Sequence, residues 1–388
     1  MHDDEQLIPG AAALAHSKRL ESLIVSDISQ AGAMPFDRYM ELVLYAPGLG
    51  YYTAGSQKFG EAGDFVTAPE ISSLFSQCLA NQCAQVLTET GGSILEFGAG
   101  SGIMAAHILK QLEVLNCLPE QYFILDLSPD LKSRQQQTIN QLVPHLAERV
   151  SWPGQMPKNF TGVMLGNEVL DAMPVSLFKI QDNQVLEQFV ENPGGELKPV
   201  WLNAGKQLQA AVKELVTQGA EFQNGYVSEI NLRLHGWLQS LSASLQQGAV
   251  LLIDYGYTGK EYYLPERSMG TLICHYRHRA HDDPYKLVGL QDITANVDFS
   301  AVSRAAQQVG LQLAGYTSQA NFLMANDLEA LMAVYSPEDS ETFLRVAQGV
   351  KALVLPSQMG ERFKVIGLTK NYDSPLQGFA LRDMRDRL

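Results

Sequence analysis

The chain has 388 residues, of which 46% are hydrophobic and 18% charged. This composition supports a large buried core and excludes a wholly disordered chain. Lysine and arginine together number 28 against 42 acidic residues, which gives a net charge of −14. That charge disfavours a non-specific nucleic-acid binder, which needs a basic face. The length suggests two to three domains at roughly 150 residues each, and it also suits one elaborated α/β domain.

Cysteine spacing and the first residues bear on the compartment. The four cysteines form no Cys-x-x-Cys pair, which disfavours a disulfide framework and a zinc site. The first ten residues are acidic and resemble neither a signal peptide nor a transit peptide. No uncharged apolar run reaches the roughly 18 residues that a membrane helix needs. We therefore expect a cytoplasmic protein of the bacterial type, with no membrane insertion and no metal.

The expected elements change character along the chain. The spacing of apolar residues predicts a helix over 11–30, and the Gly-, Tyr- and Phe-rich stretch 44–73 predicts a long loop. Pro69 is expected to open a helix that runs toward Leu87. From Ser93 on, short apolar strands alternate with helical runs, which is the pattern of a parallel sheet with right-handed crossovers. Strands are expected to begin near residues 93, 121, 149, 162, 248, 310 and 362.

One amphipathic helix is expected before the strand AVLLIDYGY. Its apolar face runs from Leu234 to Leu245. Gly248 suits the C′ position that follows such a helix.

The clearest motif is LEFGAGSG at 95–102, between an expected strand and an expected helix. Glycine permits positive φ and lets a ligand approach the backbone closely. A glycine loop after the first strand is where an open α/β sheet binds nucleotides. The third glycine comes one position earlier than in the dinucleotide fingerprint, where Ile103 stands instead. With Glu96 before the loop, this spacing favours an adenosyl sulfonium over a pyrophosphate.

Other readings of these residues stay open. The glycines also suit a plain strand-to-helix turn, and Glu96 also suits a strand-end carboxylate that nearby backbone donors satisfy. Asp126 ends the second strand, where an acid can accept hydrogen bonds from both ribose hydroxyls. Its alternative is a solvent-facing residue at a helix start.

Several further segments make the chain resemble the MidA family of class I S-adenosylmethionine-dependent methyltransferases, which includes the mitochondrial complex I assembly-factor arginine methyltransferase. The matching segments span about Tyr45 to Lys370, most of the chain. GDFVTAPEIS and NEVLDAMPV are far more specific than the glycine loop alone. The others are ILEFGAGSG, LLIDYGY, DITANVDF and GERFKVIGLTK.

The resemblance implies an α/β fold with a Rossmann-like seven-stranded sheet whose last strand is antiparallel. Residues 1–92 would form a helical N-terminal cap with a loop that covers the cofactor. Residues 93–388 would form the methyltransferase core. This core would carry a β-rich insertion at 176–224, a polar insertion at 257–298 and a helical insertion at 321–360.

The resemblance also implies S-adenosyl-L-methionine as the cofactor. Glu96 would approach the amino-acid part of the cofactor, and Asp126 would approach the ribose. For Asp64 the alternative is a turn residue, and for Glu70 it is a first-turn carboxylate on the helix dipole. The expected cofactor-binding residues are Gly63, Asp64, Pro69, Glu70, Glu96, Gly98, Gly100, Gly102, Asp126 and Asn167.

Glu168 and Asp171 are the expected catalytic residues, because the end of the fourth strand faces the transferred methyl in class I methyltransferases. A carboxylate pair can hold a guanidinium by paired hydrogen bonds, and the acidic net charge suits a basic peptide. Their alternative is a helix cap with first-turn acids. Asp292, Thr294 and Asp298 are expected to bind substrate, unless they form a turn that caps the next helix.

We therefore expect a methyltransferase that acts on a protein arginine, on a partner of the respiratory-complex type. A protein substrate is expected, nucleic acid is not, and a homo-oligomer is one option. Two alternatives stay open: a small-molecule methyltransferase, and a non-catalytic assembly factor that retains the fold. Ile103 disfavours a nicotinamide-dependent dehydrogenase.

Overall fold

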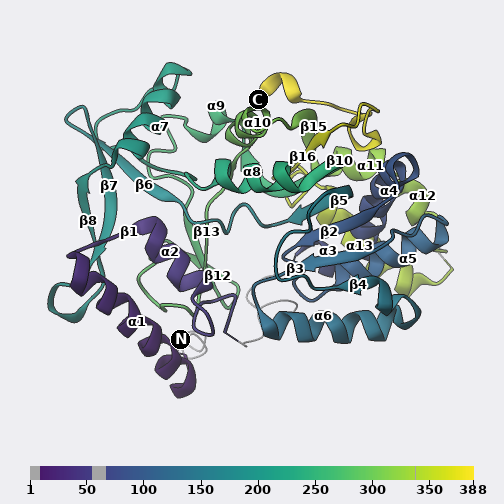
Figure 1. Ribbon diagram of the computed structural model, residues 1–388, viewed down its shortest axis with the longest axis horizontal. Helices are drawn as coiled ribbons and strands as arrows, with labels where there is room; N and C mark the ends of the chain where they lie inside the picture. The colour runs from purple at the N-terminus through teal and green to yellow at the C-terminus, as the bar shows by residue number, and fades with distance from the viewer. Residues whose placement is uncertain (1–8, 55–66, 337) are drawn as a thin grey trace. The chain divides into compact units, whose positions relative to one another are not determined.

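The computed structural model describes residues 9–54, 67–336 and 338–388. The chain forms two compact units, each assembled from separate stretches of sequence (Figure 1). The first unit takes its described residues from Met1–Phe65, Asp171–Leu234 and Gly259–Asn296. The second takes them from Val66–Leu170, His235–Thr258 and Val297–Leu388.

The second unit is built on a mixed sheet. Its described residues give eight strands, seven of them in the order β15-β16-β10-β5-β2-β3-β4, with β14 beside β10. β10, β5, β2, β3 and β4 run parallel, whereas β16 is antiparallel to β10 and β15. The seven expected strands and the antiparallel last strand are therefore confirmed. The strands are β2 Ser93–Phe97, β3 Tyr122–Leu125, β4 Val150–Ser151, β5 Phe160–Asn167, β10 Leu245–Tyr257, β14 Val297–Asp298, β15 Gln312–Ser318 and β16 Phe363–Lys370.

Helices cover the sheet of the second unit, and its central strands β2, β5 and β10 are largely buried on both faces. Successive strand side chains point to opposite faces, so Ile94 of β2 joins the α4–α5 core while Phe97 meets Trp237 of α8 with ring centroids 5.6 Å apart. The helices are α3 Ala68–Ile71, α4 Ser73–Thr90, α5 Ile103–Val114, α6 Pro129–Leu142, α8 Leu234–Ser244, α10 Phe299–Gln308, α11 Gln319–Ala325, α12 Leu328–Met332 and α13 Ser340–Val354.

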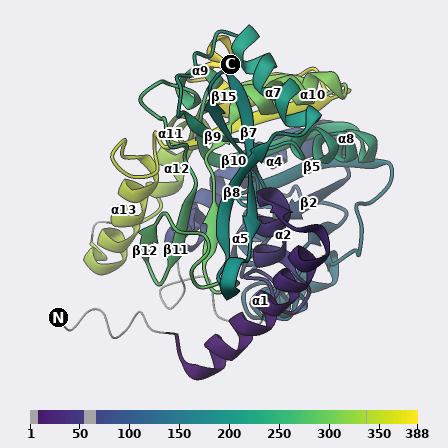
Figure 2. The same ribbon diagram turned by 90° about the vertical axis from the view of Figure 1, so that its left-hand side faces the viewer.

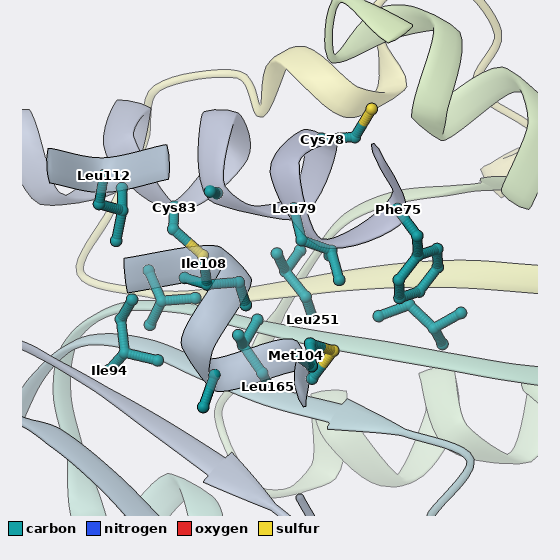
Figure 3. Close-up of a cluster of buried hydrophobic side chains, with 14 of the residues drawn as sticks. Phe75, Cys78, Leu79, Cys83, Ile94, Met104, Ile108, Leu112, Leu165 and Leu251 are labelled. Carbon is teal, nitrogen blue, oxygen red and sulfur yellow. The ribbon is translucent and has the colours of Figure 1, made fainter. Parts of the chain in front are cut away.

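The core between α4, α5 and the sheet is the support of the glycine loop. Figure 3 shows Leu79 of α4, Ile108 of α5 and the strand residues Leu165 and Leu251, all buried in one cluster. Truncating such a leucine to alanine costs about 2–5 kcal/mol. This packing fixes the strand ends and the start of α5 relative to each other.

The expected helix end at Gly248 is wrong. α8 ends at Ser244 and the chain enters β10 at Leu245. Gly248 has φ +132° and pairs with Gly162 of β5, where an added Cβ would overlap the Gly162 carbonyl oxygen. The close approach of two strands, rather than helix termination, accounts for this glycine.

The first unit joins the N-terminal helices to the β-rich residues 176–230. Its five-stranded sheet has the order β1-β7-β6-β9, with β8 beside β7. Phe36 and Met40 of α2 share a buried cluster with Leu177 and Val190 of this sheet. Figure 2 shows β11 and β12, which pair in a second, three-stranded sheet with β13 on the other side of β11. The elements are α1 Ala11–Ala31, β1 Met34–Pro35, α2 Phe36–Tyr45, β6 Ser176–Gln181, β7 Gln184–Glu191, β8 Lys198–Asn203, α7 Lys206–Thr217, β9 Val227–Ile230, α9 Gly259–Tyr262, β11 Ile273–Tyr276, β12 Arg279–His281 and β13 Asp292–Thr294.

Among the described helices, none is long and apolar enough to cross a membrane. No group of three or more His, Cys, Asp or Glu side chains is placed to hold a metal ion in the described part of the chain.

Candidate functional site

The glycine motif forms the turn between β2 and α5 in the second unit. Gly98, Gly100 and Gly102 have φ values of +62°, +53° and +83°, in the region that favours glycine. An added Cβ at Gly102 would lie 2.9 Å from the Cα of Gln135. At exposed Gly98 an added Cβ would meet only Val169 Cγ2, at 3.6 Å, among described atoms. The loop is therefore tightly held on one side and open to a ligand at Gly98.

Glu70 contacts the glycine loop directly. Ser101 Oγ donates a hydrogen bond to Glu70 Oε1 at 2.5 Å. Pro69 is buried beside it in the first turn of α3. Glu70 thus braces the loop that is expected to bind the cofactor. Gly63 and Asp64, which the sequence also assigned to the cofactor, lie outside the described residues.

Glu96 is a buried carboxylate just before the loop, with 1% of its surface exposed. The Tyr122 hydroxyl on β3 donates to its Oε2 at 2.6 Å. Burial raises the pKa of Glu96 to about 7, the hydrogen bond from Tyr122 lowers it, and the charge of Asp126 raises it. A carboxyl group with this pKa changes charge near neutral pH. Tyr122 is not among the residues predicted from the sequence, although the period of two in β3 turns it toward the same face as Ile124.

Asp126 directly follows β3 and both of its oxygens are engaged. The Ser128 N–H donates to Oδ1 at 3.0 Å, which forms a turn into α6. The Gln135 amide donates to Oδ2 at 2.8 Å. Gln135 also donates to the Gly100 carbonyl oxygen at 3.1 Å. Gln135 is not among the residues predicted from the sequence, because a glutamine in a polar helix forms no motif.

Asn167 and Glu168 stand at the carboxyl end of β5, the neighbour of β2. Gly166 pairs with Phe97, so the strand ends that carry Asn167 and Gly98 lie at the same level. Asn167 Nδ2 donates to Glu168 Oε1 at 3.0 Å. The buried Oδ1 of Asn167 has no hydrogen-bond partner among the described residues. A buried acceptor of this kind fits a site that receives a polar ligand.

Asp171 and Asp292 belong to the first unit and lie near the same tyrosine. The Tyr52 hydroxyl donates to both Asp292 oxygens, at 2.9 and 3.0 Å. Burial first, then the charges of Asp292, Tyr45 and Asp171, raise the pKa of Tyr52. The rings of Tyr45 and Tyr52 stack with centroids 5.5 Å apart. Asp171, an expected catalytic residue, and Asp292, an expected substrate-binding residue, thus belong to one aromatic and acidic cluster. The sequence did not predict that these two residues lie near the same tyrosine.

Thr294 and Asp298 separate into different units. Thr294 shares a strand face with Asp292 on β13, and its buried Oγ1 has no hydrogen-bond partner within the described residues. Asp298 lies in the second unit and caps α10, because it accepts the Ala301 N–H at 3.0 Å. Burial raises the pKa of Asp298. Capping is the alternative that the sequence left open for this residue.

These residues fit an adenosyl ligand. The glycine loop, Asp126 and the unpaired acceptor of Asn167 all stand at the carboxyl ends of parallel strands, where open α/β sheets bind nucleotides. The three positive φ values favour glycine and so keep side chains off the loop, and a carboxylate such as Asp126 is an acceptor suited to hydroxyl donors.

Comparison with known proteins identifies similar chains. Residues 78–317 match the model of a family of S-adenosyl-L-methionine-dependent methyltransferases. A crystal structure from Burkholderia thailandensis with bound S-adenosyl-homocysteine is 43% identical, with a TM-score of 0.94, and the match covers 98% of this chain and 99% of that one. A protein arginine methyltransferase NDUFAF7 homolog, mitochondrial, from Drosophila melanogaster is 26% identical over 91% of this chain and 84% of its own. The Danio rerio protein arginine methyltransferase NDUFAF7, mitochondrial, is 27% identical over 90% and 86%.

Proposed function

Because the chain belongs to this family of S-adenosyl-L-methionine-dependent methyltransferases, we propose that its methyl acceptor is an arginine of a protein. This acceptor is supported by relatives named protein arginine methyltransferase, whose similarity extends over most of the chain. The observation that carries the proposal is the acidic cluster of Asp292 and Asp171 around Tyr52. The net charge of −14 also suits a basic protein segment.

The cofactor supplies a methyl group on a sulfonium, which is already activated for displacement. The protein therefore acts mainly by orienting the acceptor and excluding water. In the second unit, the glycine loop and Asp126 hold the adenosyl side, and Glu70 braces the loop through Ser101.

An arginine acceptor needs help because its guanidinium is protonated and a poor nucleophile. Carboxylates can hold two of its nitrogens by charge-assisted hydrogen bonds and draw the positive charge away from the third. The third nitrogen then attacks the methyl carbon as the C–S bond breaks. As the new C–N bond forms, this nitrogen loses a proton to one of the carboxylates, and S-adenosyl-homocysteine leaves as a neutral thioether.

Each unit, taken by itself, offers carboxylates of the kind that this work requires. Glu168 follows β5 at φ +53°, and the Asn167 amide holds its Oε1. Such a left-handed conformation is costly for glutamate and is typical of functional sites. In the first unit, Asp171 and Asp292 offer further carboxylates beside two stacked tyrosines. Stacked aromatic faces favour a planar cation.

The proposal is tested with tritiated-methyl S-adenosylmethionine and a lysate from cells that lack the gene. Wild-type protein should place the label in acid-precipitable protein. Glu168→Gln and Asp171→Asn should bind S-adenosyl-homocysteine with near wild-type affinity and transfer at least about tenfold less label, since each loses a charged acceptor. Label in an organic extract would instead indicate a small-molecule acceptor. No transfer, together with full rescue of the gene-deleted cells by Glu168→Gln, would indicate the non-catalytic role.

A further inference from the structure

We propose that Gln135 is a positioning residue for the cofactor, which holds the Asp126 carboxylate and the Gly100 carbonyl in their binding orientation, and that Trp152 fixes the Gln135 amide. The inference rests on the cofactor site and not on the arginine acceptor. Its outcome is therefore independent of the acceptor proposed above.

Gln135 links the two cofactor-binding elements with one amide group. It is fully buried on α6. Its Nε2 donates to Asp126 Oδ2 at 2.8 Å and to the Gly100 carbonyl oxygen at 3.1 Å. An amide nitrogen has two hydrogens, so both are used. The glycine loop after β2 and the acid after β3 are thus tied to the same side chain.

Trp152 determines which way the Gln135 amide faces. The indole nitrogen of Trp152 donates to Gln135 Oε1 at 2.8 Å. An indole N–H is only a donor, so it accepts nothing and requires the amide oxygen opposite it. With the oxygen held there, the Gln135 nitrogen must face Asp126 and Gly100. The flipped amide would place its oxygen against two other acceptors and its nitrogen against a donor.

The backbone of Gln135 also presses on the glycine loop. An added Cβ at Gly102 would lie 2.9 Å from the Gln135 Cα and 3.2 Å from its Cβ. Helix α6 therefore contacts the loop through both its backbone and this side chain. This contact gives a reason for the third glycine of the motif beyond its positive φ of +83°.

The network sets the carboxylate of Asp126 before a ligand arrives. Ser128 holds Oδ1 at 3.0 Å while Gln135 holds Oδ2 at 2.8 Å. A carboxylate oxygen can accept more than one hydrogen bond, so Asp126 can bind a ribose hydroxyl while Ser128 and Gln135 hold it. A side chain that is fixed in advance loses less entropy when the ligand binds. Gln135 is therefore expected to contribute to affinity through the ribose contact of Asp126.

The test compares binding of S-adenosyl-homocysteine and its 2′-deoxy analogue by calorimetry. Gln135→Met keeps the length of the side chain and removes both donors. We expect affinity for S-adenosyl-homocysteine to fall about tenfold, as for loss of a hydrogen bond to a charged group. The affinity ratio between the two ligands should shrink toward one, because a loosely held Asp126 gains little from the hydroxyl.

Trp152→Phe provides the second variant, and Gln137→Met, an exposed position on the same helix, is the matched control. Trp152→Phe should weaken binding and shrink the ratio in the same direction, whereas Gln137→Met should change neither. If Gln135→Met does not fold, Trp152→Phe alone decides. Unchanged affinity, or equal weakening of both ligands with the ratio kept, would overturn the positioning role.

Discussion

The backbone N–H of Leu170 donates a hydrogen bond to Asp254 Oδ2 at 2.9 Å. Two residues earlier, the Glu168 N–H donates to the carbonyl oxygen of Ile253 at 2.9 Å. Adjacent residues of β10 thus hold the turn after β5 at two points. These bonds keep Glu168 at φ +53°, a conformation that non-glycine residues otherwise avoid.

Asp254→Ala should therefore loosen the turn that carries Glu168. We expect the free energy of unfolding to fall by about 2 kcal/mol, since a buried hydrogen bond to a carboxylate is lost. The rate of methyl transfer should fall more than affinity for S-adenosyl-homocysteine, because the glycine loop is untouched. Denaturant titration, calorimetry and a transfer assay measure these three effects. Asp254→Asn keeps an acceptor oxygen and should be milder, and an equally large loss of cofactor affinity would refute this role.

Gly102→Ala should abolish or strongly weaken cofactor binding. Its Cβ would lie 2.9 Å from the Gln135 backbone, in addition to the cost of φ +83°. Gly310→Ala is the matched control, because Gly310 has φ +82° and an added Cβ meets nothing within 4 Å. Both should lose about 1–2 kcal/mol of stability to backbone strain. Only Gly102→Ala should lose affinity for S-adenosyl-homocysteine in calorimetry, and equal affinities for both variants would contradict the explanation.

The Glu96 carboxyl should make stability depend on pH near neutrality. Its pKa rises from 4.5 to about 7 in the folded protein, chiefly through burial. The folded state therefore holds the proton more tightly, so the stabilisation is complete below about pH 4.5 and is lost as the pH rises through about 7. Chemical denaturation across this range measures it. Glu96→Gln should remove the slope, worth about 3 kcal/mol at most, and an unchanged slope would show that Glu96 does not titrate there.

Tyr122→Phe tests the titration of Glu96 by removing the hydroxyl that donates a hydrogen bond to its carboxylate. The hydroxyl lowers the pKa of Glu96, whereas the charge of Asp126 raises it. Cys83 of α4 also interacts electrostatically with Glu96. Removing the hydroxyl should move the loss of stability to higher pH.

If the ammonium of the cofactor meets Glu96, binding of S-adenosyl-homocysteine at pH 6 should release protons from wild-type protein and not from Glu96→Gln. Calorimetry in buffers of different ionisation enthalpy counts them.

Tyr52→Phe should affect the acceptor and spare the cofactor. The change removes the hydroxyl that donates to both Asp292 oxygens and leaves the ring that stacks on Tyr45. With a basic protein acceptor, KM should rise about tenfold, as expected when a carboxylate loses its orientation. Affinity for S-adenosyl-homocysteine should not change. A loss of cofactor affinity with unchanged KM would remove Tyr52 from the acceptor side.

The strands, the glycine loop and Asp126 could be predicted, because each corresponds to a local pattern in the sequence. Buried parallel strands read as apolar runs, and the loop needs glycine at fixed positions. Gln135, Tyr122 and Asp254 could not be predicted as partners, because each contacts a residue distant in sequence: Gly100, Glu96 and Leu170, respectively. Gly248 was assigned to a helix end for the same reason. A glycine is required at this position because the strand residue Gly162, distant in sequence, pairs with it.

The acceptor residues show that a sequence motif does not predict which side chains lie together in the structure. NEVLD places Glu168 and Asp171 together in sequence, but the structure assigns them to different units. Asp292 was singled out by the family motif alone, and its connection with Asp171 appears only through Tyr52. The capping role of Asp298 follows a local rule and could be anticipated.

The most direct test of the arginine acceptor is tandem mass spectrometry of proteins methylated with trideuteromethyl S-adenosylmethionine. Lysate from cells that lack the gene supplies unmethylated acceptors, and Gly102→Ala protein is the control. We expect peptides with a deuterated methyl on an arginine guanidino nitrogen, formed by wild-type protein and absent with the control. Deuterated methyl groups found only on lysine, on carboxylates or on small molecules would contradict it.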